Sequence, residues 1–301
     1  ANGTRSTVHM APFPKDEALT EELMRDPKTV GNISDAGAHL QQHAGALPGQ
    51  MPYWQAQLGD EQPLLSLPLD FERPATPSYR GAVLKLQIGA EQAEALRSQA
   101  RKGGHTLFVL MLAAMAVVLS RYSGQSDIRI GAPNAGRNRK ELEGLIGFFI
   151  NTQVLRVQVD ERATFAALLE QVKDVIGGAQ SHQELPFEHL VDALLPERNL
   201  AHNPLFQFKI NQHVAAGDAS RKRLGTLEVE GFAREGGDAR FDLAFDFSDK
   251  PDGIEGYFTY ATDLFEPATI QRLADSLRRV LDVLSHAQQQ PIVDHLEVAA
   301  Q

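Results

Sequence analysis

Residues 241–260, FDLAFDFSDKPDGIEGYFTY, contain the clearest structural signal in the chain. In the first half, large apolar residues alternate with the polar residues Asp242 and Asp246. This two-residue period is typical of a β-strand with one buried face. Pro251-Asp252-Gly253 then favours a tight turn. The stretch therefore predicts a β-hairpin whose second strand runs to Tyr260.

Other segments around this hairpin carry strand or helix patterns. Residues 82–88 alternate like a strand, and residues 128–132 and 149–159 are further strand candidates. Helices are expected over residues 90–102 and from Thr106, which can cap a helix that is apolar nearly all round through Leu119.

The apolar stripe of residues 165–176 predicts a helix that ends at Gly177-Gly178, and a last helix is expected to start at Pro267. Strands and helices thus mix without strict βαβ alternation. We therefore expect an α+β layered sandwich.

Composition narrows the class of protein. The 301 residues are 43% apolar, enough for a buried core, and carry a net charge of -10, which argues against nucleic acid as a partner. The absence of cysteine excludes disulfides, cysteine nucleophiles and thiolate metal sites, and fits a cytoplasmic protein. The longest apolar run, residues 107–119, is too short to cross a bilayer, and no signal segment opens the chain. We expect no membrane anchor.

Four strings carry a family resemblance, in this order: residues 131–137 (GAPNAGR), 146–152 (IGFFINT), 182–188 (HQELPFE) and 198–205 (RNLAHNPL). Together with Tyr53-Trp54, residues 67–70 and residues 257–265, they resemble the C-terminal half of a condensation domain from nonribosomal peptide synthetases. The motif residues assigned a structural role are Pro133, Arg137, Gly147, Pro186, Phe187, Glu188, Arg198, Asn203 and Pro204.

The resemblance implies a fold similar to chloramphenicol acetyltransferase, with two lobes and a tunnel between them. It also implies peptidyl carrier protein domains as partners, whose phosphopantetheine arms enter the tunnel, and no cofactor bound by the chain itself. The implied reaction is attack of an acceptor amine on a donor thioester. Stabilisation of the developing oxyanion and a proton acceptor would complete the chemistry.

Condensation domains place a His-His-x-x-x-Asp-Gly motif in their N-terminal lobe, and none of the ten histidines here has a histidine neighbour. We therefore expect a partial domain that is inactive in peptide formation alone, with an N-terminal lobe supplied in trans as a further possible partner. Losing a lobe should expose an apolar face. Such faces associate, so we also expect a homo-oligomer.

The resemblance implies four residues at the tunnel: Asn151, Thr152, Arg156 and Gln183. In the family, the arginine at the position of Arg156 pairs with the aspartate of the motif that is missing here. An arginine keeps its charge, so a buried Arg156 must find another carboxylate, face water or pair with a second chain. Asn151 and Thr152 either bind pantetheine or water at the lobe junction, or cap the end of a strand.

The catalytic residues remain unknown from the sequence. Ser181 and His182 are candidates for a nucleophile and base, but adjacent side chains rarely align for this chemistry. Two alternative functions stay open: a small-ester hydrolase that uses the exposed acyl groove, and a non-catalytic carrier-binding module. Neither a Gly-x-Ser-x-Gly nor a Ser-x-x-Lys motif supplies a nucleophile for the ester hydrolase.

The cluster Arg221-Lys222-Arg223 is either a solvated loop between strands or a contact for an acidic carrier domain.

Residues 1–45 differ in character from the main domain, which we place at residues 46–301. Within this leader, residues 17–41 resemble a short stretch of D-aminoacylase-like amidohydrolases. Asp35, His39 and His43 stand at four-residue steps, a spacing that weakly suggests a divalent metal, but two glycines interrupt the stretch and we assign no metal site. The leader is either a fragment of an unrelated gene or a degraded linker.

Overall fold

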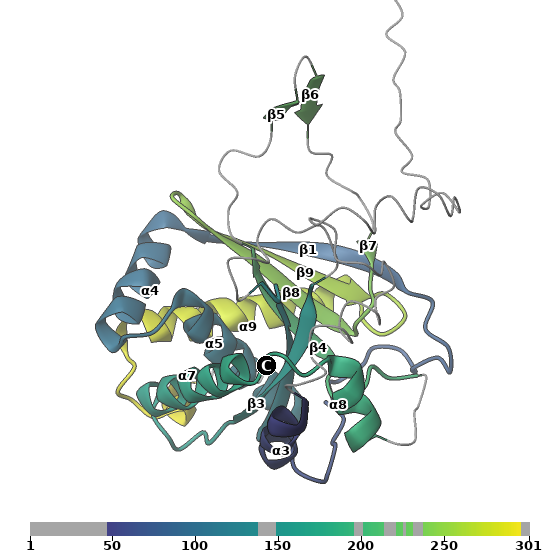
Figure 1. Ribbon diagram of the computed structural model, residues 1–301. Helices are drawn as coiled ribbons and strands as arrows, with labels where there is room; N and C mark the ends of the chain where they lie inside the picture. The colour runs from purple at the N-terminus through teal and green to yellow at the C-terminus, as the bar shows by residue number, and fades with distance from the viewer. Residues whose placement is uncertain are drawn as a thin grey trace, which may run out of the picture.

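The computed structural model describes residues 47–137, 149–195, 201–213, 221–224, 227–230 and 237–295. Its elements appear in Figure 1 in this order: α3 (Leu47–Leu58), β1 (Arg80–Gly89), α4 (Ala90–Gly103), α5 (Leu107–Ser123), β2 (Asp127–Asn134), β3 (Asn151–Gln158), α7 (Phe165–Ser181), α8 (Phe187–Leu194), β4 (Phe208–His213), β5 (Arg221–Leu224), β6 (Leu227–Glu230), β7 (Gly237–Asp238), β8 (Leu243–Lys250), β9 (Gly253–Ala261), α9 (Pro267–His286) and the 3-10 turn η1 (Ile292–His295).

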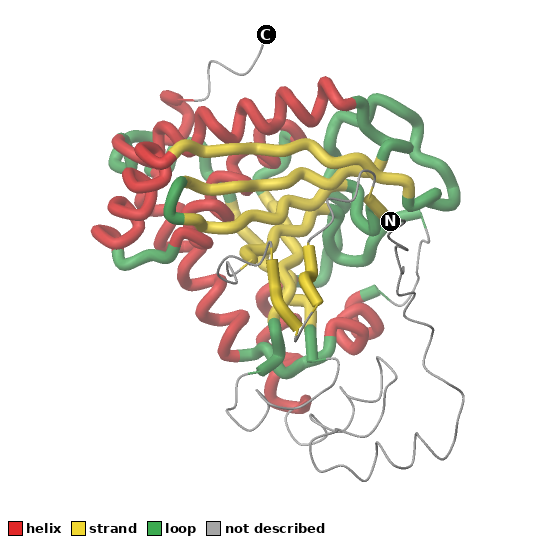
Figure 2. Tube along the Cα trace, turned by 90° about the horizontal axis from the view of Figure 1, so that it is seen from above, coloured by secondary structure: helices red, strands yellow, loops and turns green. Residues whose placement is uncertain are grey.

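One mixed sheet organises the described residues, with strand order β3-β2-β4-β8-β9-β1-β7. β4 runs parallel to both of its neighbours, and the other pairs are antiparallel. Helices α4, α5, α7 and α9 form a layer against the sheet, as Figures 1 and 2 show. This arrangement confirms the α+β layered sandwich. The predicted hairpin is β8–β9, in which Phe245 lies opposite Phe258.

Helix α5 lies in the middle of the core. The Thr106 hydroxyl accepts a hydrogen bond from the Val109 amide at 3.3 Å, so the predicted cap is confirmed. All residues from Val109 to Ser120 are buried.

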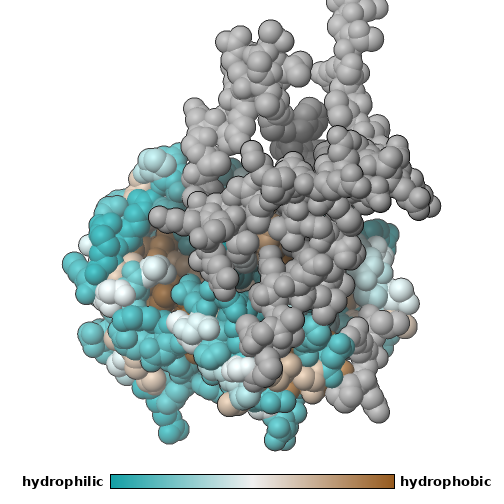
Figure 3. All heavy atoms as spheres, in the orientation of Figure 1, coloured by the Kyte–Doolittle hydropathy of each residue, from teal (hydrophilic) through white to brown (hydrophobic). Residues whose placement is uncertain are grey.

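The last helix, α9, begins at Pro267 as predicted, and its apolar stripe, from Ile270 to Leu284, packs against α4 and α5. The described surface in Figure 3 is mainly hydrophilic, with small apolar areas.

The predicted end of the helix at Gly177-Gly178 is wrong, because α7 continues through both glycines to Ser181. The reason at Gly178 is packing against α3. A Cβ at Gly178 would lie 2.3 Å from the Tyr53 hydroxyl oxygen, so a larger residue there would displace the Tyr53 side chain. The glycine pair, which in the sequence suggests the end of a helix, lies inside α7, where Gly178 packs closely against α3.

The basic cluster Arg221-Lys222-Arg223 is not a loop: its backbone forms β5, which pairs with β6 in a separate two-stranded sheet.

Several other predictions fall outside the described residues, namely those on residues 1–45, Gly147 and Arg198. Within the described ranges no single helix combines the length and apolar composition of a membrane span, and α4 with α5 meets that test only as a pair bent by 104°.

Candidate functional site

Asn151, at the start of β3, is the centre of a buried hydrogen-bond network. Its amide nitrogen donates to the carbonyl oxygens of Gln183 at 3.1 Å and Leu185 at 2.7 Å. Its amide oxygen accepts from the backbone amides of Thr152 at 2.9 Å and Phe187 at 3.1 Å. These contacts use both amide hydrogens and both acceptor positions of the side chain. Asn151 therefore joins β3 to the turn between α7 and α8, and the half-buried Thr152 lies beside it.

Asn134 connects the end of β2 to the same turn. Its amide nitrogen donates to the Gln183 side-chain oxygen at 2.7 Å, and its own side-chain oxygen accepts from the Gly136 amide at 2.8 Å. Gly136 has a φ of 65°, and a Cβ there would lie 1.9 Å from the Phe149 carbonyl oxygen. Glycine is thus required by both conformation and space. The Arg137 guanidinium lies 4.3 Å from the centre of the Phe149 ring, a cation–π contact.

Three sequence strings therefore meet in one place. Residues 131–137, 149–152 and 182–188 are joined by Asn134, Asn151 and Gln183 into a single hydrogen-bonded unit, which we call the Asn151 corner. In register, Pro133 lies opposite Thr152. The sequence named most of these residues, but not the bonds between them.

Helix α8 begins at this corner. Pro186 is its N-cap, and its fixed φ suits the entry into a helix, while Glu188 in the first turn places a carboxylate where the helix dipole favours it. The Phe187 ring lies 5.7 Å from the Phe206 ring, centre to centre, which ties α8 to the segment before β4.

Ser181 and His182 each bond to a carbonyl of the preceding helical turn. The Ser181 hydroxyl donates to the Gly177 oxygen at 2.9 Å, and His182 Nδ1 lies 2.8 Å from the Gly178 oxygen. The imidazole of His182 stacks on the Tyr53 ring at 3.9 Å, and the Trp54 indole donates to the His182 carbonyl at 2.9 Å. His182 thus holds α3 against α7, and Ser181 makes no use of it as a base.

Arg156 meets a carboxylate of its own chain. Its Nε and one terminal nitrogen each lie 2.9 Å from an oxygen of Asp127, and its other terminal nitrogen donates to the Gln57 carbonyl at 3.1 Å. The two side chains are about a quarter exposed. Among the three outcomes expected for this arginine, the structure has the intrachain pair.

Arg129, which sequence reasoning missed, lies directly opposite Arg156 in the β2–β3 register and is 3% exposed. It donates to the carbonyls of Leu58 at 2.9 Å and Glu61 at 2.8 Å. Burial lowers the pKa of its guanidinium; Asp127 opposes this shift and Arg156 adds to it. Its neighbours Ile128 and Ile130 are buried as well, so β2 is covered on both faces here. The end of α3 and the segment after it cover the face that carries Arg129.

The string around Asn203 and Pro204 organises the extended segment that leads from α3 to β1. Asn203 donates to the Arg240 carbonyl at 2.8 Å, and Gln207, a further residue that the sequence did not single out, accepts from the Leu65 amide at 2.7 Å. Gln207 also donates to the Asn203 carbonyl at 3.0 Å. Gln207 therefore links this string to the extended segment at Leu65.

One carboxylate on the sheet has a strongly lowered pKa. Glu255 on β9 forms ion pairs with Lys250 and Lys85, and these hydrogen bonds lower its pKa to about 2. The side chain of Glu255 is 15% exposed, whereas both lysines are close to half exposed.

Comparison with known proteins shows the family of the chain. The sequence model of the family described as condensation domain matches residues 38–297. One of the linear gramicidin synthase proteins of Brevibacillus parabrevis is 44% identical over 246 residues, which are 82% of this chain and 3% of that protein.

Two solved structures are also similar. The X-domain from teicoplanin biosynthesis has a TM-score of 0.76 and 27% identity, over 85% of this chain and 59% of that one. The complex of the X-domain and OxyB from the same biosynthesis has a TM-score of 0.73 and 27% identity, over 82% of this chain and 54% of that one. The chain thus spans less than two thirds of the length of each of these relatives. From the family match and the relatives, the chain belongs to the condensation-domain family of nonribosomal peptide synthetases.

Proposed function

We propose that these 301 residues form one side of a condensation site, in which the amine of an acceptor attacks the thioester of a donor. Condensation domains of this family act on groups carried by the phosphopantetheine of carrier proteins. The observation that supports the proposal is the Asn151 corner. Three strings of the family resemblance, far apart in sequence, meet there in a preformed unit, as expected of a surface that positions two substrates.

The chemistry divides into positioning and proton transfer. As the new C–N bond forms, the C–S bond of the donor thioester breaks, the amine loses a proton and the thiol leaves. His182 holds α3 to α7, so it is unsuited to accept that proton. We therefore assign the base to an N-terminal lobe that carries the His-His-x-x-x-Asp-Gly motif. The present residues then position the pantetheine arms, with Thr152 and Gln183 as the predicted contacts.

The test is reconstitution. The purified chain is mixed with an N-terminal lobe of a relative, a donor-loaded carrier protein and an acceptor-loaded carrier protein, and dipeptidyl thioester is measured by mass spectrometry. Product should require both lobes, and should be lost when the second histidine of the added lobe is replaced by alanine. Failure of the two lobes to associate, together with absence of product, would contradict the proposal.

A second candidate is a binding module without catalysis. The observation in its favour is the likeness to the X-domain in its complex with OxyB, a protein–protein assembly. Carrier-protein capture by the isolated chain, with no product in the reconstitution, would favour this function.

We do not propose an ester hydrolase, because the hydroxyl of Ser181 donates to Gly177 and the imidazole of His182 is held by Gly178 and Tyr53. Hydrolysis of p-nitrophenyl acetate should stay at the same rate in Ser181→Ala and in His182→Phe, which keeps an aromatic ring against Tyr53. A clear loss of rate in both variants would restore the hydrolase hypothesis.

A further inference from the structure

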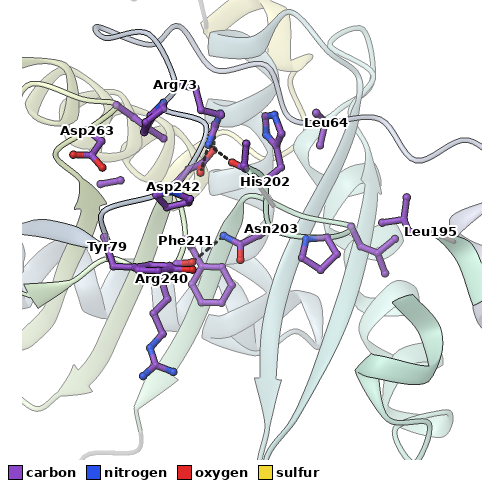
Figure 4. Close-up of a pocket in the computed structure, with 18 of the residues that line it drawn as sticks. Leu64, Arg73, Tyr79, Leu195, His202, Asn203, Arg240, Phe241, Asp242 and Asp263 are labelled. Atoms are coloured by element: carbon purple, nitrogen blue, oxygen red, sulfur yellow. Dashed lines mark hydrogen bonds and ion pairs between the residues drawn. The ribbon is translucent and has the colours of Figure 1, made fainter. Parts of the chain in front are cut away.

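A cavity of about 340 Å³ lies at the end of the sheet where β4 and β8 begin and β9 ends (Figure 4). β2 runs parallel to β4, so the Asn151 corner, at the end of β2, lies toward the opposite end of the sheet. The volume is within the range of roughly 300–1,000 Å³ that small-molecule sites occupy. The cavity is therefore a candidate site separate from the corner.

Much of the cavity lining is apolar and rigid. Its apolar lining includes Leu64, Pro74, Pro77, Leu195, Pro204 and Phe241. Each proline ring fixes the backbone φ, so this part of the lining loses little conformational freedom when a ligand binds. Such walls favour an aromatic or branched aliphatic group.

Two strained residues line the same cavity. Within the described part of the chain, the non-glycine residues with positive φ are Tyr79 at 58° and Leu205 at 66°, and both contribute to the cavity lining. A residue with a Cβ adopts this conformation at a cost in free energy, and such residues cluster at ligand sites. Tyr79 is 55% exposed, so core packing does not account for its conformation.

Three of the four charged residues that line the cavity, Arg73, Asp242 and Asp263, are in ion pairs, and the guanidinium of the fourth, Arg240, points away from the Arg73–Asp242 pair (Figure 4). Arg73 binds Asp242 through both terminal nitrogens, one at 2.9 Å, and also donates to the Ala201 carbonyl at 3.3 Å. Asp263 accepts from the Ser78 amide at 3.0 Å and from Arg80 at 3.2 Å. An ionic ligand would find no unpaired counter-charge among the three paired groups and would lose hydration on entry, so a neutral ligand fits better.

His202 supplies a polar group beside the Arg73–Asp242 pair (Figure 4). Its Nδ1 is buried against the protein and has no hydrogen-bond partner among the described residues, so Nε2 is the ring nitrogen that a molecule in the cavity can reach. Burial, followed by the charge of Arg73, lowers the pKa of the imidazole, so the ring is neutral at pH 7. A neutral imidazole nitrogen either donates or accepts, and an amide group can meet it in either role.

We propose that this cavity binds a small neutral molecule that has an aromatic or branched aliphatic group and an amide. The apolar group lies among the prolines and Phe241, and the amide faces His202. Tyr79 is held in its strained conformation at the rim, where its ring covers the bound molecule. Binding requires neither carrier proteins nor a second lobe, so an experiment on the chain alone tests it independently of condensation.

The probe is N-acetyl-L-phenylalaninamide, titrated into the full chain by isothermal calorimetry. Saturable binding is expected, and N-acetyl-L-phenylalanine, which carries a carboxylate, should bind at least about tenfold more weakly. His202→Phe keeps the ring and removes the polar atoms, and should weaken binding about tenfold. The matched control is His213→Phe, because His213 is on β4 outside the cavity lining and its side chain is 58% exposed. This variant should bind like the parent chain.

A second variant separates ligand binding from structure. Tyr79→Gly relieves the positive φ, so its thermal midpoint should rise, while loss of the ring should weaken binding about fivefold. A residue with only a structural role would not give greater stability together with weaker binding. Absence of saturable binding to the parent chain up to about 10 mM, or unchanged affinity in either His202→Phe or Tyr79→Gly, would overturn the proposal.

Discussion

Replacing Asn151 by alanine tests whether this residue is structural or binds ligand. The substitution leaves four backbone groups without their partners: the carbonyls of Gln183 and Leu185 and the amides of Thr152 and Phe187. The site is 7% exposed, so water cannot replace all four bonds. At about 1 kcal/mol for each hydrogen bond, the free energy of unfolding should fall by about 3–4 kcal/mol.

Urea denaturation followed by far-ultraviolet circular dichroism measures this difference directly. At roughly 2–4 °C for each kcal/mol, the thermal midpoint should fall by about 10 °C. Thr152→Val is the matched control next in the chain, because it keeps the side-chain shape and the backbone amide that Asn151 binds. It should change the free energy of unfolding by less than about 0.5 kcal/mol.

A loss of less than about 1 kcal/mol in Asn151→Ala would refute this reasoning. It would mean that the network contributes little to stability, and the prediction that Asn151 binds pantetheine or water would then be the better account of the residue.

Three further predictions concern ion pairs and association. A double-mutant cycle of Asp127→Asn and Arg156→Gln should give a coupling energy of about 1 kcal/mol, reduced by the partial exposure of the pair; a coupling near zero would contradict it. The folded-state pKa of Glu255 is about 2 against a usual 4.5, so its contribution to stability is complete above pH 4.5 and is lost as the pH falls toward 2. Glu255→Gln should therefore flatten the measured loss of stability over that range, and an equally steep loss would count against the ion pairs. The chain should sediment as a homo-oligomer at micromolar concentration, because a lobe that stands without its partner lobe should expose an apolar face; a purely monomeric boundary would go against this.

Local patterns were enough for most of the fold. The alternation of residues 82–88, the Thr106 cap and the Pro251-Asp252-Gly253 turn each depend on neighbours in sequence, and β1, α5 and the β8–β9 hairpin follow from them. The prediction failed at Gly177-Gly178, where Gly178 allows contact with Tyr53, a residue more than a hundred positions away. A helix stop and a close helix contact use the same residue type, and only packing distinguishes them.

The site was predicted as a set of residues but not as an arrangement. Asn151, Gln183 and Arg156 were identified by their strings, whereas Asp127 as the partner of Arg156 was not, because it lies on the neighbouring strand in a register that sequence does not reveal. Asp242 was expected on the polar face of a strand. It is instead 7% exposed and paired with Arg73, since the strand begins one residue later.

By itself, then, the sequence determined the layered class, the family strings and several elements, among them β1, α5, α9 and the β8–β9 hairpin, because hydrophobic period, caps and turns act over a few residues. It predicted neither α3 nor β4. Tertiary structure alone decided which polar side chains are satisfied by the protein: the full bonding of Asn151, the buried Arg129, and the cavity with its two strained residues. The physical reason is that a hydrogen bond depends on distance and angle between atoms, and packing sets both for groups far apart in the chain.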